Sequence, residues 1–379
     1  MRHFDVIVIG TGGMGAAAAM HLARRGVRVC GLDRFAPGHD RGSSHGQTRL
    51  IRLAYYEHPD YVPLLGRAYE LWRELEVLAG RTLLVESGLL LAGPPGSEVV
   101  GGTVASAEIH GVPLERLTVA EAARRWPQVR LPEGWAAVHE PRGGYLFVEE
   151  CVRAHAAAAA RAGAVLESGR VVHGWRVGDD GRVVVETDAG GYTADRLVVA
   201  AGSWAAGLLR LPALRLEVLR KSLFWYEPAA AARADLAAGR LPCFGFDGPE
   251  GFFYGFPALS DAGLKIAEHT GGTPVADPLH VDRGIDAGER RRVEDVLEAR
   301  LPMAGTHLAA HATCLYTMSP DGHFVVGLHP RYPQVAVAAG FSGHGFKFAA
   351  VMGEILADLA TTGRSSLPIG FLSPARFGG

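Results

Sequence analysis

The sequence predicts an α/β fold with α+β character, built from two domains whose segments alternate along the chain. The first observation is a strand, a glycine turn, a helix and a second strand within residues 4–33. The second is an apolar strand at 197–202, and a further strand, glycine turn and long helix at 335–360. The third is period-two alternation between 216 and 312, typical of a largely antiparallel sheet. The segments of the parallel-sheet type, at the start, middle and end of the chain, enclose the segment with period-two alternation. Both domains are therefore discontinuous.

The opening segment reads as a compact βαβ unit. Residues 4–10 are a short apolar strand, 13–26 a helix that ends at Gly26, and 27–33 the next strand. Such a unit places its two strands side by side in a parallel sheet.

Helical spacing of apolar residues returns at three later places. It predicts helices over 61–79, 119–125 and 150–163. The segments that follow, 164–177 and 182–202, alternate like strands and end in LVVAAG, typical of a buried parallel strand.

The composition excludes several classes of protein. At 379 residues the chain is long for one core, and a net charge of −2 gives no basic excess for nucleic acid or an anionic membrane. The start, MRHFDVIVIG, is a strand rather than a signal peptide, and no apolar run approaches the roughly 20 residues that span a bilayer. We therefore expect a cytoplasmic protein. The four cysteines lack CxxC spacing, which argues against a zinc site or a disulfide framework, and we expect no metal.

Lysine is rare in this chain. Of 38 basic residues only Lys221, Lys265 and Lys347 are lysines, which leaves 38 − 3 = 35 arginines. A lysine kept against that bias suggests a place where a compact ammonium cannot be replaced by a planar guanidinium. Chance is the alternative explanation for any one of them.

The first glycine turn fits a dinucleotide site. Gly10, Gly12 and Gly15 match GxGxxG between the strand and the helix. They allow the tight turn, the approach of the backbone to a pyrophosphate and close helix–strand packing, and the helix N-terminus favours the phosphates. Asp33 closes the second strand, where an acid can accept hydrogen bonds from ribose hydroxyls. The fingerprint alone does not separate FAD from NAD.

Cationic side chains are concentrated in residues 43–52, which read SSHGQTRLIR. If this segment is helical, His45, Arg49 and Arg52 share one face, where they repel one another unless an anion or an electron-rich ring lies opposite. A solvated basic helix end is the alternative.

Three later segments carry further polar groups. Strand alternation puts Lys265 and His269 on one face, and Tyr254 lies in an upstream run that can pair with that strand. Cys314 reads as a small buried residue. In 342–347, SGHGFK, a second glycine turn precedes a helix, so its backbone N–H groups can face an anion beside Lys347.

Taken together, these motifs resemble the monomeric sarcosine oxidase and N-methyltryptophan oxidase family of flavoproteins. Five blocks occur in the family's order: GTGGMG, SSHGQTRLIR, FYGFP with LKIAEH, CLYTMSPDGHF and FSGHGFK. The resemblance implies a glutathione-reductase-like FAD-binding Rossmann domain with a smaller antiparallel-sheet substrate domain. We expect the first domain at 1–86, 147–217 and 318–379, and the second at 87–146 and 218–317.

The resemblance also implies roles for individual residues. Arg52 and Lys347 match the pair that binds the substrate carboxylate, and Lys265, with His45 and Arg49 nearby, matches the site of oxygen reduction. His269, Tyr254 and Tyr316 match groups around the substrate amine, and Cys314 matches the cysteine that carries covalent FAD. The other expected FAD contacts are Gly10, Gly12, Gly15, Asp33, Arg34, Ser43, Ser44, Thr48, Ser342, Gly343 and Gly345.

The implied reaction is sarcosine + O2 + H2O giving glycine, formaldehyde and H2O2, carried out by a monomer. The stretch 243–254 does not align clearly, and Gly245 or Phe246 could change the space for the substrate side chain. Other N-alkyl amino acids, N-methyltryptophan, proline and pipecolate therefore stay open as substrates. The alternatives are a dehydrogenase with a non-oxygen acceptor, a glycine oxidase-like enzyme and a non-enzymatic flavin module.

Overall fold

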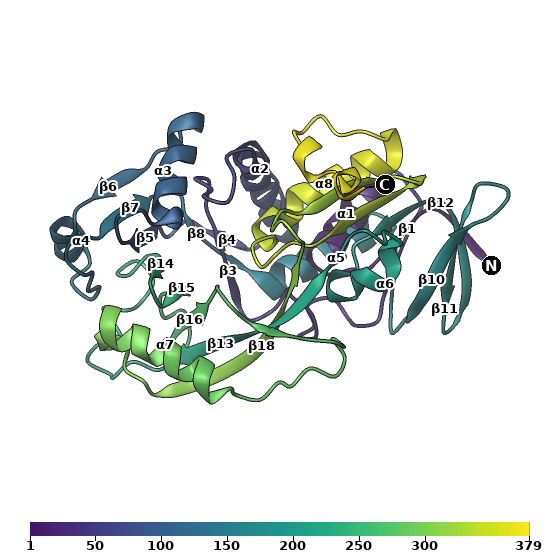
Figure 1. Ribbon diagram of the computed structural model, residues 1–379. Coiled ribbons are helices and arrows are strands. Elements are labelled where there is room, and N and C mark those ends of the chain that lie inside the picture. Colours follow the sequence, from purple (N-terminus) through teal and green to yellow (C-terminus); the bar gives the residue numbers. More distant parts are fainter. Residues whose placement is uncertain (379) are drawn as a thin grey trace.

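The structure, a computed structural model, describes residues 1–378 and contains two large sheets and a small one. Figure 1 shows the eight-stranded sheet toward the N-terminus on one side of the molecule and the nine-stranded sheet on the other. The mixed α/β fold predicted from the sequence is confirmed.

The eight-stranded sheet is built around the opening strand. Its strands are β1 (Arg2–Ile9), β2 (Val29–Asp33), β9 (Val165–Ser168), β10 (Val172–Val177), β11 (Val183–Thr187), β12 (Gly190–Val199), β19 (Val325–His329) and β20 (Tyr332–Ala339). β1 pairs in parallel with β2 and β12, β2 with β9, and β12 with β20. Segments from the start, middle and end of the chain thus meet in one sheet, as the sequence predicts.

Four helices pack beside this sheet (Figure 1). They are α1 (Gly13–Arg24), α2 (Tyr61–Ala79), α5 (Val148–Arg161) and α8 (Ala349–Thr362). Small residues let α1 and α8 approach closely, because a Cβ at Gly353 would lie 2.5 Å from the Ala17 Cβ. This packing fixes the glycine turns that precede both helices.

The nine-stranded sheet is antiparallel except for one pair. Its strands are β5 (Leu89–Gly93), β6 (Glu115–Leu117), β7 (Ala136–Glu140), β13 (Glu217–Tyr226), β14 (Cys243–Gly248), β15 (Gly251–Phe256), β16 (Leu264–Glu268), β17 (Thr273–Pro274) and β18 (Leu308–Met318). β14 and β5 are parallel. The predicted pairing of the Tyr254 segment with the Lys265 segment is confirmed, since β15 and β16 are neighbours with Tyr254 opposite Ala267.

Four further helices and a small sheet lie outside these groups. They are helices α3 (Glu98–His110), α4 (Val119–Arg125), α6 (Ala205–Leu209) and α7 (Ala287–Arg300), and a sheet of β3 (Thr48–Ile51), β4 (Leu84–Val85) and β8 (Gly144–Phe147). The division into domains at the expected boundaries stays a prediction.

Residues 43–52 do not form the helix that would place His45, Arg49 and Arg52 on one face. Residues 48–51 are strand β3, and Gly46 and Gln47 before it both have a positive φ, at +88° and +69°. That backbone is incompatible with a continuous helix. His45, Arg49 and Arg52 are therefore not stacked on one helical face.

Two further features concern the described part of the chain. Across residues 1–378, no helix is both long and apolar enough to cross a lipid bilayer. In the same range, no three His, Cys, Asp or Glu side chains gather where they could hold a metal ion.

Candidate active site

One cavity of about 400 Å³ passes from the β1–α1 turn to the face of the nine-stranded sheet. Its walls come from both large sheets and from the turn before α8. The predicted site residues that line it are Gly10, Gly12, Asp33, Arg34, Ser43, Ser44, Arg49, Arg52, Tyr254, His269, Tyr316, Gly343, Gly345 and Lys347. Segments distant in sequence thus form a single site.

The other predicted site residues lie directly behind this wall. They are Gly15, His45, Thr48, Lys265, Cys314 and Ser342, and His45, Thr48, Lys265, Cys314 and Ser342 are all buried. Burial, together with the nearby Arg49 charge, lowers the pKa of His45 to about 4, so its imidazole is neutral near pH 7. His45 therefore adds no charge beside Arg49.

The β1–α1 turn has the form that a dinucleotide pyrophosphate requires. Gly10 has φ +87°, a Cβ at Gly12 would meet no atom within 4 Å, and a Cβ at Gly15 would lie 1.7 Å from the Gly10 oxygen. No side chain caps the N-terminus of α1, so its first N–H groups are free to bind phosphate. Asp33 holds the turn, because its Oδ2 accepts from the Thr11 N–H at 2.6 Å. These residues fit FAD.

The loop at Gly46 and Gln47 is held in its left-handed form from two sides. The Glu149 carboxylate accepts from the N–H of Gly46 at 2.6 Å and of Gln47 at 3.1 Å. The Lys265 Nζ donates to the carbonyls of Gly46 at 2.5 Å and Thr48 at 2.8 Å. These contacts stabilise an otherwise costly backbone and fix the position of Lys265.

Lys265 is 1% exposed, and burial followed by the neighbouring Arg49 charge lowers its pKa well below the ordinary lysine value. Its Nζ is fixed by the two carbonyl acceptors of Gly46 and Thr48. The residue is therefore a localised donor directly beneath the cavity wall.

Arg49 links the loop to β18. Its guanidinium donates to the carbonyls of Thr48 and Ser43, both at 2.9 Å, and to Cys314 Sγ at 3.1 Å. A cation this close to sulfur stabilises negative charge on it, and the thiolate is the nucleophilic form of cysteine. Cys314 is 1% exposed, and its sulfur also lies 3.6 Å from the Ser43 carbonyl and 3.8 Å from the Leu315 carbonyl.

The far end of the cavity is cationic. The Arg52 guanidinium lies between the rings of Tyr55 and Tyr56, 4.3 and 4.4 Å from their centroids, and donates to Glu57 Oε2 at 2.6 Å. Burial alone would raise the pKa of Glu57, but the Arg52 charge brings it to about 2. The two side chains form a buried ion pair, so the carboxylate of Glu57 is the partner of the Arg52 guanidinium.

Lys347 faces the same tyrosine. Its Nζ is 5.0 Å from the Tyr55 ring centroid and donates to the His344 carbonyl at 2.7 Å. Burial, with the Arg52 charge second, lowers its pKa to about 7. His344 Nδ1 contacts the Tyr55 hydroxyl at 2.7 Å, and His344 Nε2 lies 3.1 Å from the Gly322 carbonyl. Arg52 and Lys347 thus converge on one small region.

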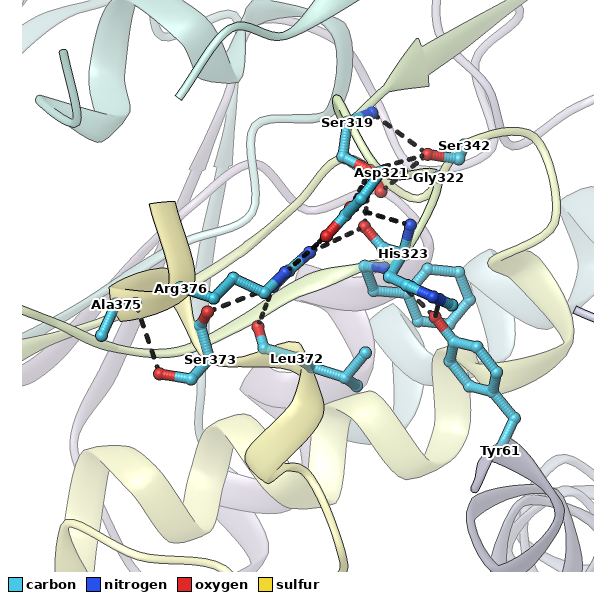
Figure 2. Close-up of polar contacts among 12 residues, drawn as sticks. Tyr61, Ser319, Asp321, Gly322, His323, Ser342, Leu372, Ser373, Ala375 and Arg376 are labelled. Atoms are coloured by element: carbon cyan, nitrogen blue, oxygen red, sulfur yellow. Dashed lines mark hydrogen bonds and ion pairs between the residues drawn. The ribbon is translucent and has the colours of Figure 1, made fainter. Parts of the chain in front are cut away.

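A hydrogen-bonded unit supports this end of the cavity (Figure 2). Arg376, near the C-terminus, donates to both carboxylate oxygens of Asp321, at 2.8 and 3.1 Å. The backbone N–H of Ser319 donates to Ser342 Oγ at 3.1 Å. The C-terminal arm, the turn at 319–322 and the segment that carries Lys347 are therefore connected (Figure 2).

Aromatic groups and a histidine form the wall on the nine-stranded sheet. His269 Nδ1 lies 3.4 Å from the Tyr316 hydroxyl, and its ring centroid is 6.2 Å from that of Tyr254. Burial lowers the pKa of His269 to about 3, so the imidazole is neutral across the physiological range. Leu91 and Phe252 complete this apolar side of the cavity.

Gly245 and Phe246, which the sequence suggested could change the space for the substrate side chain, do not line the cavity. Phe246 points into a separate core cluster, and Gly245 lies behind Leu91 and Phe252, where an added Cβ would come within 2.7 and 2.8 Å of them. Leu91 and Phe252 contact the cavity instead.

Glu57, Tyr55 and His344 were not predicted as site residues. Glu57 lies in YYEHPD, where a charged residue in a polar turn looks like an ordinary surface group. The one available signal for His344 is its place inside the second glycine turn, between Gly343 and Gly345.

Comparisons with known proteins agree with this geometry. The profile of the family described as FAD dependent oxidoreductase matches residues 5–359. The chain is 42% identical over 378 residues to a monomeric sarcosine oxidase of Streptomyces avermitilis, covering 98% of this chain and 97% of that one. It is 36% identical over 377 residues to an N-methyl-L-tryptophan oxidase of Salmonella enteritidis PT4, with 99% of each covered. Among solved structures, NikD, an amino acid oxidase essential for nikkomycin biosynthesis, superposes with a TM-score of 0.86 at 28% identity, covering 99% of this chain and 98% of that one.

Proposed function

This chain belongs to the FAD-dependent oxidoreductase family, and from that premise we propose that it is a sarcosine oxidase. The reaction converts sarcosine, O2 and H2O to glycine, formaldehyde and H2O2. The single observation that carries the proposal is the convergence of Arg52 and Lys347 on Tyr55, beside the wall formed by His269 and Tyr316. A carboxylate and an amine separated by one carbon fit these two neighbouring groups of residues.

Bound FAD would supply the two-electron acceptor that takes hydrogen from the carbon next to the amine nitrogen and passes the electrons to oxygen. The glycine turn at Gly10–Gly15, Asp33 and the turn at Ser342–Gly345 are the groups that we propose to hold it. Each has backbone or carboxylate groups available at the cavity wall.

The substrate carboxylate is bound by Arg52 and Lys347. Two cations fix its orientation as well as its charge, so the reacting carbon is held in one place and the barrier falls through proximity. Arg52 already has Glu57 as an ion-pair partner. Binding of the substrate therefore exchanges one carboxylate for another at that guanidinium, or adds a second.

The amine lies against His269, Tyr254 and Tyr316. Loss of hydrogen from the carbon requires an uncharged amine, and this wall surrounds the amine with aromatic rings and a neutral imidazole. Because the pKa of His269 is about 3, it adds no positive charge of its own at this wall.

Oxygen is reduced near Lys265. A donor fixed by two carbonyls does not need to reorganise as negative charge develops, and such preorganised donors give large electrostatic stabilisation. Cys314 carries FAD covalently through its sulfur, with Arg49 stabilising the nucleophilic thiolate. The monomeric name of the relatives supports a monomer here as well.

Oxidation of N-methyltryptophan is the second candidate, favoured by the 36% identical relative. The side chains that would contact an indole are Leu91, Phe252 and Tyr56. A change at one apolar contact alters selectivity by about 1–3 kcal/mol, so relatives with the same fold differ easily in substrate.

The test is product analysis with a panel of amines. Sarcosine, N-methyltryptophan, proline and glycine are incubated with the purified flavoprotein, and H2O2, formaldehyde and the amino acid product are quantified. We expect the highest kcat/KM with sarcosine and equal amounts of glycine, formaldehyde and H2O2. A higher value for N-methyltryptophan or proline would reject sarcosine as the substrate, and turnover without H2O2 would indicate a dehydrogenase.

A further inference from the structure

All three lysines of this chain are buried, and each donates to backbone carbonyls. Lys265 and Lys347 have roles in the proposed reaction, but Lys221 has none. We propose that Lys221 is a positioning residue, which fixes the turn after His269 and the ring of Tyr316 and so shapes the amine end of the substrate site. The inference rests on the proposed function for what that site binds.

Lys221 lies on β13, opposite Cys314 on β18, and is 4% exposed. Its Nζ donates to the Thr270 carbonyl at 2.6 Å and the Gly271 carbonyl at 3.1 Å. The next residue, Gly272, passes so close that a Cβ there would lie 3.0 Å from the lysine Cδ. The turn therefore wraps around the lysine side chain.

This turn depends on outside support. Gly271 and Gly272 have φ values of +65° and +122°, and glycine loses more backbone entropy than other residues when it is ordered. Lys221 supplies two hydrogen bonds at that point. His269 immediately precedes the turn, and its own N–H donates to the Phe252 carbonyl at 2.7 Å. The chain on both sides of the His269 ring is thus fixed.

Lys221 also contacts Tyr316. Its Nζ lies 5.5 Å from the centroid of that ring, and on Gly343 an added Cβ would be only 2.2 Å from the ring. The ring is packed between Gly343 and the β13 side, with its hydroxyl 3.4 Å from His269 Nδ1. One ammonium therefore holds the turn after His269 and the ring of Tyr316, two of the three residues proposed to face the substrate amine.

The positive charge of Lys221, like its position, affects the amine end of the substrate site. Burial lowers the pKa of Lys221 to about 8. Three neighbours favour its charged form, namely Glu268 on β16, Glu289 on α7 and Cys314 on β18, and Arg292 on α7 opposes it. On the other side, His269 is faced by Glu57, His344, Lys347 and Lys221 itself. A cation here disfavours protonation of His269 and of a bound amine.

A lysine suits this place better than an arginine. Both acceptors are reached by one nitrogen, whereas a planar guanidinium presents its donors in a fixed fork and needs more room than the close approach of Gly272 leaves. This explains why one of the three lysines among 35 arginines stands here.

The variants Lys221→Met and Lys221→Arg test position and charge separately. Arg220→Met is the matched control, because Arg220 is the next residue on β13 and also donates to two carbonyls, those of Asp282 at 2.8 Å and Gly284 at 2.5 Å. Its side chain contacts the 282–284 segment and Glu289 on α7, at 2.8 Å, and not the 269–272 turn, so this variant is the control for hydrogen exchange in that turn. All proteins are studied as flavin-loaded enzymes.

The first measurement is hydrogen exchange without substrate. We expect amides of the 269–272 segment to exchange about tenfold faster in K221M and K221R, and at the native rate in R220M.

The second measurement is the pH dependence of flavin reduction by sarcosine. K221M should reduce the rate by about tenfold and raise the apparent pKa of the reaction by about one unit, whereas K221R should lower the rate but keep the pKa.

The results separate this inference from the proposed function. If the native enzyme is not reduced by sarcosine, the proposed function fails, and the exchange data still test the role of Lys221 in the turn. Native exchange at 269–272 in K221M would overturn the inference. Faster exchange with an unchanged rate and unchanged pH profile would also overturn it, because Lys221 would then hold the turn without affecting the site.

Discussion

Arg49 donates a hydrogen bond to the sulfur of Cys314 across 3.1 Å, although the two residues are 265 positions apart in sequence. The contact joins the loop before β3 to β18 of the nine-stranded sheet. It places a permanent cation, which itself lines the cavity, beside a thiol buried behind the cavity wall. A cation next to sulfur favours the nucleophilic form of cysteine.

The first prediction concerns covalent attachment of FAD. Cys314→Ala should retain no flavin after acid denaturation, because within residues 1–378 Cys314 is the cysteine whose sulfur contacts Arg49, a residue that lines the cavity. Arg49→Met should slow attachment by at least about tenfold, because the thiolate loses its cation. Flavin fluorescence of denatured protein on a gel measures both. Cys243→Ala, at a buried cysteine, is the control, and flavin retained by the Cys314 variant would refute the linkage site.

The second prediction separates reaction with oxygen from reaction with substrate. Lys265→Met removes the donor held by the Gly46 and Thr48 carbonyls and should slow reoxidation of the reduced enzyme by about 10²–10³-fold. Reduction by sarcosine should change far less. Stopped-flow absorbance measures the two steps separately, and equal losses in both would contradict the assigned role.

The third prediction concerns the ion pair of Arg52 and Glu57. If the substrate carboxylate competes with Glu57 for Arg52, Glu57→Gln should tighten binding of a small carboxylate inhibitor by about tenfold. Arg52→Met should weaken it by at least about a hundredfold, since a hydrogen-bonded charge pair is lost. Titration followed by flavin absorbance gives both dissociation constants. Weaker binding in the Glu57 variant would show that this carboxylate assists the substrate instead.

The fourth prediction concerns folding at low pH. His155, on α5 beside the ring of Trp72, is 1% exposed, and burial lowers its pKa to about 3, below the ordinary value of about 6.5. The unfolded chain therefore binds a proton more readily, and stability falls as the pH drops below 6.5 toward 3. At pH 4.5 this one group should cost about 2–3 kcal/mol.

His155→Leu should remove that loss without harm near pH 7, because neither ring nitrogen has a hydrogen-bond partner in the structure of residues 1–378. Denaturant unfolding at pH 7 and 4.5 measures the difference. The exposed residue His280 gives the control, His280→Gln, which should behave like the native protein. An unchanged pH slope in the leucine variant would contradict the prediction.

Much of the framework could be predicted because it depends on local patterns. The βαβ unit follows from apolar strands around a glycine turn, and helices over 61–79 and 119–125 follow from helical periodicity, and all these elements are present. The side on which Phe246 points could not be predicted. Its strand is buried on both faces, so alternation of polar and apolar residues, the usual signal, is missing.

The site residues also fall into those that a local motif predicts and those that depend on contacts between distant parts of the chain. Gly10, Gly12 and Asp33 belong to a local motif. The left-handed loop at Gln47 depends on Glu149, about a hundred residues away, which is why local spacing suggested a helix instead. Glu57 enters the site only because Arg52 is buried beside it, a contact that no spacing reveals.

The central claim is that this flavoenzyme takes electrons from sarcosine and gives them to oxygen. It is tested most directly by mixing the purified protein with sarcosine without air, recording the flavin absorbance, and then admitting air. We predict rapid bleaching by sarcosine, followed by return of the colour with one H2O2 formed per flavin. No bleaching by sarcosine, or bleaching that air does not reverse, would contradict the claim.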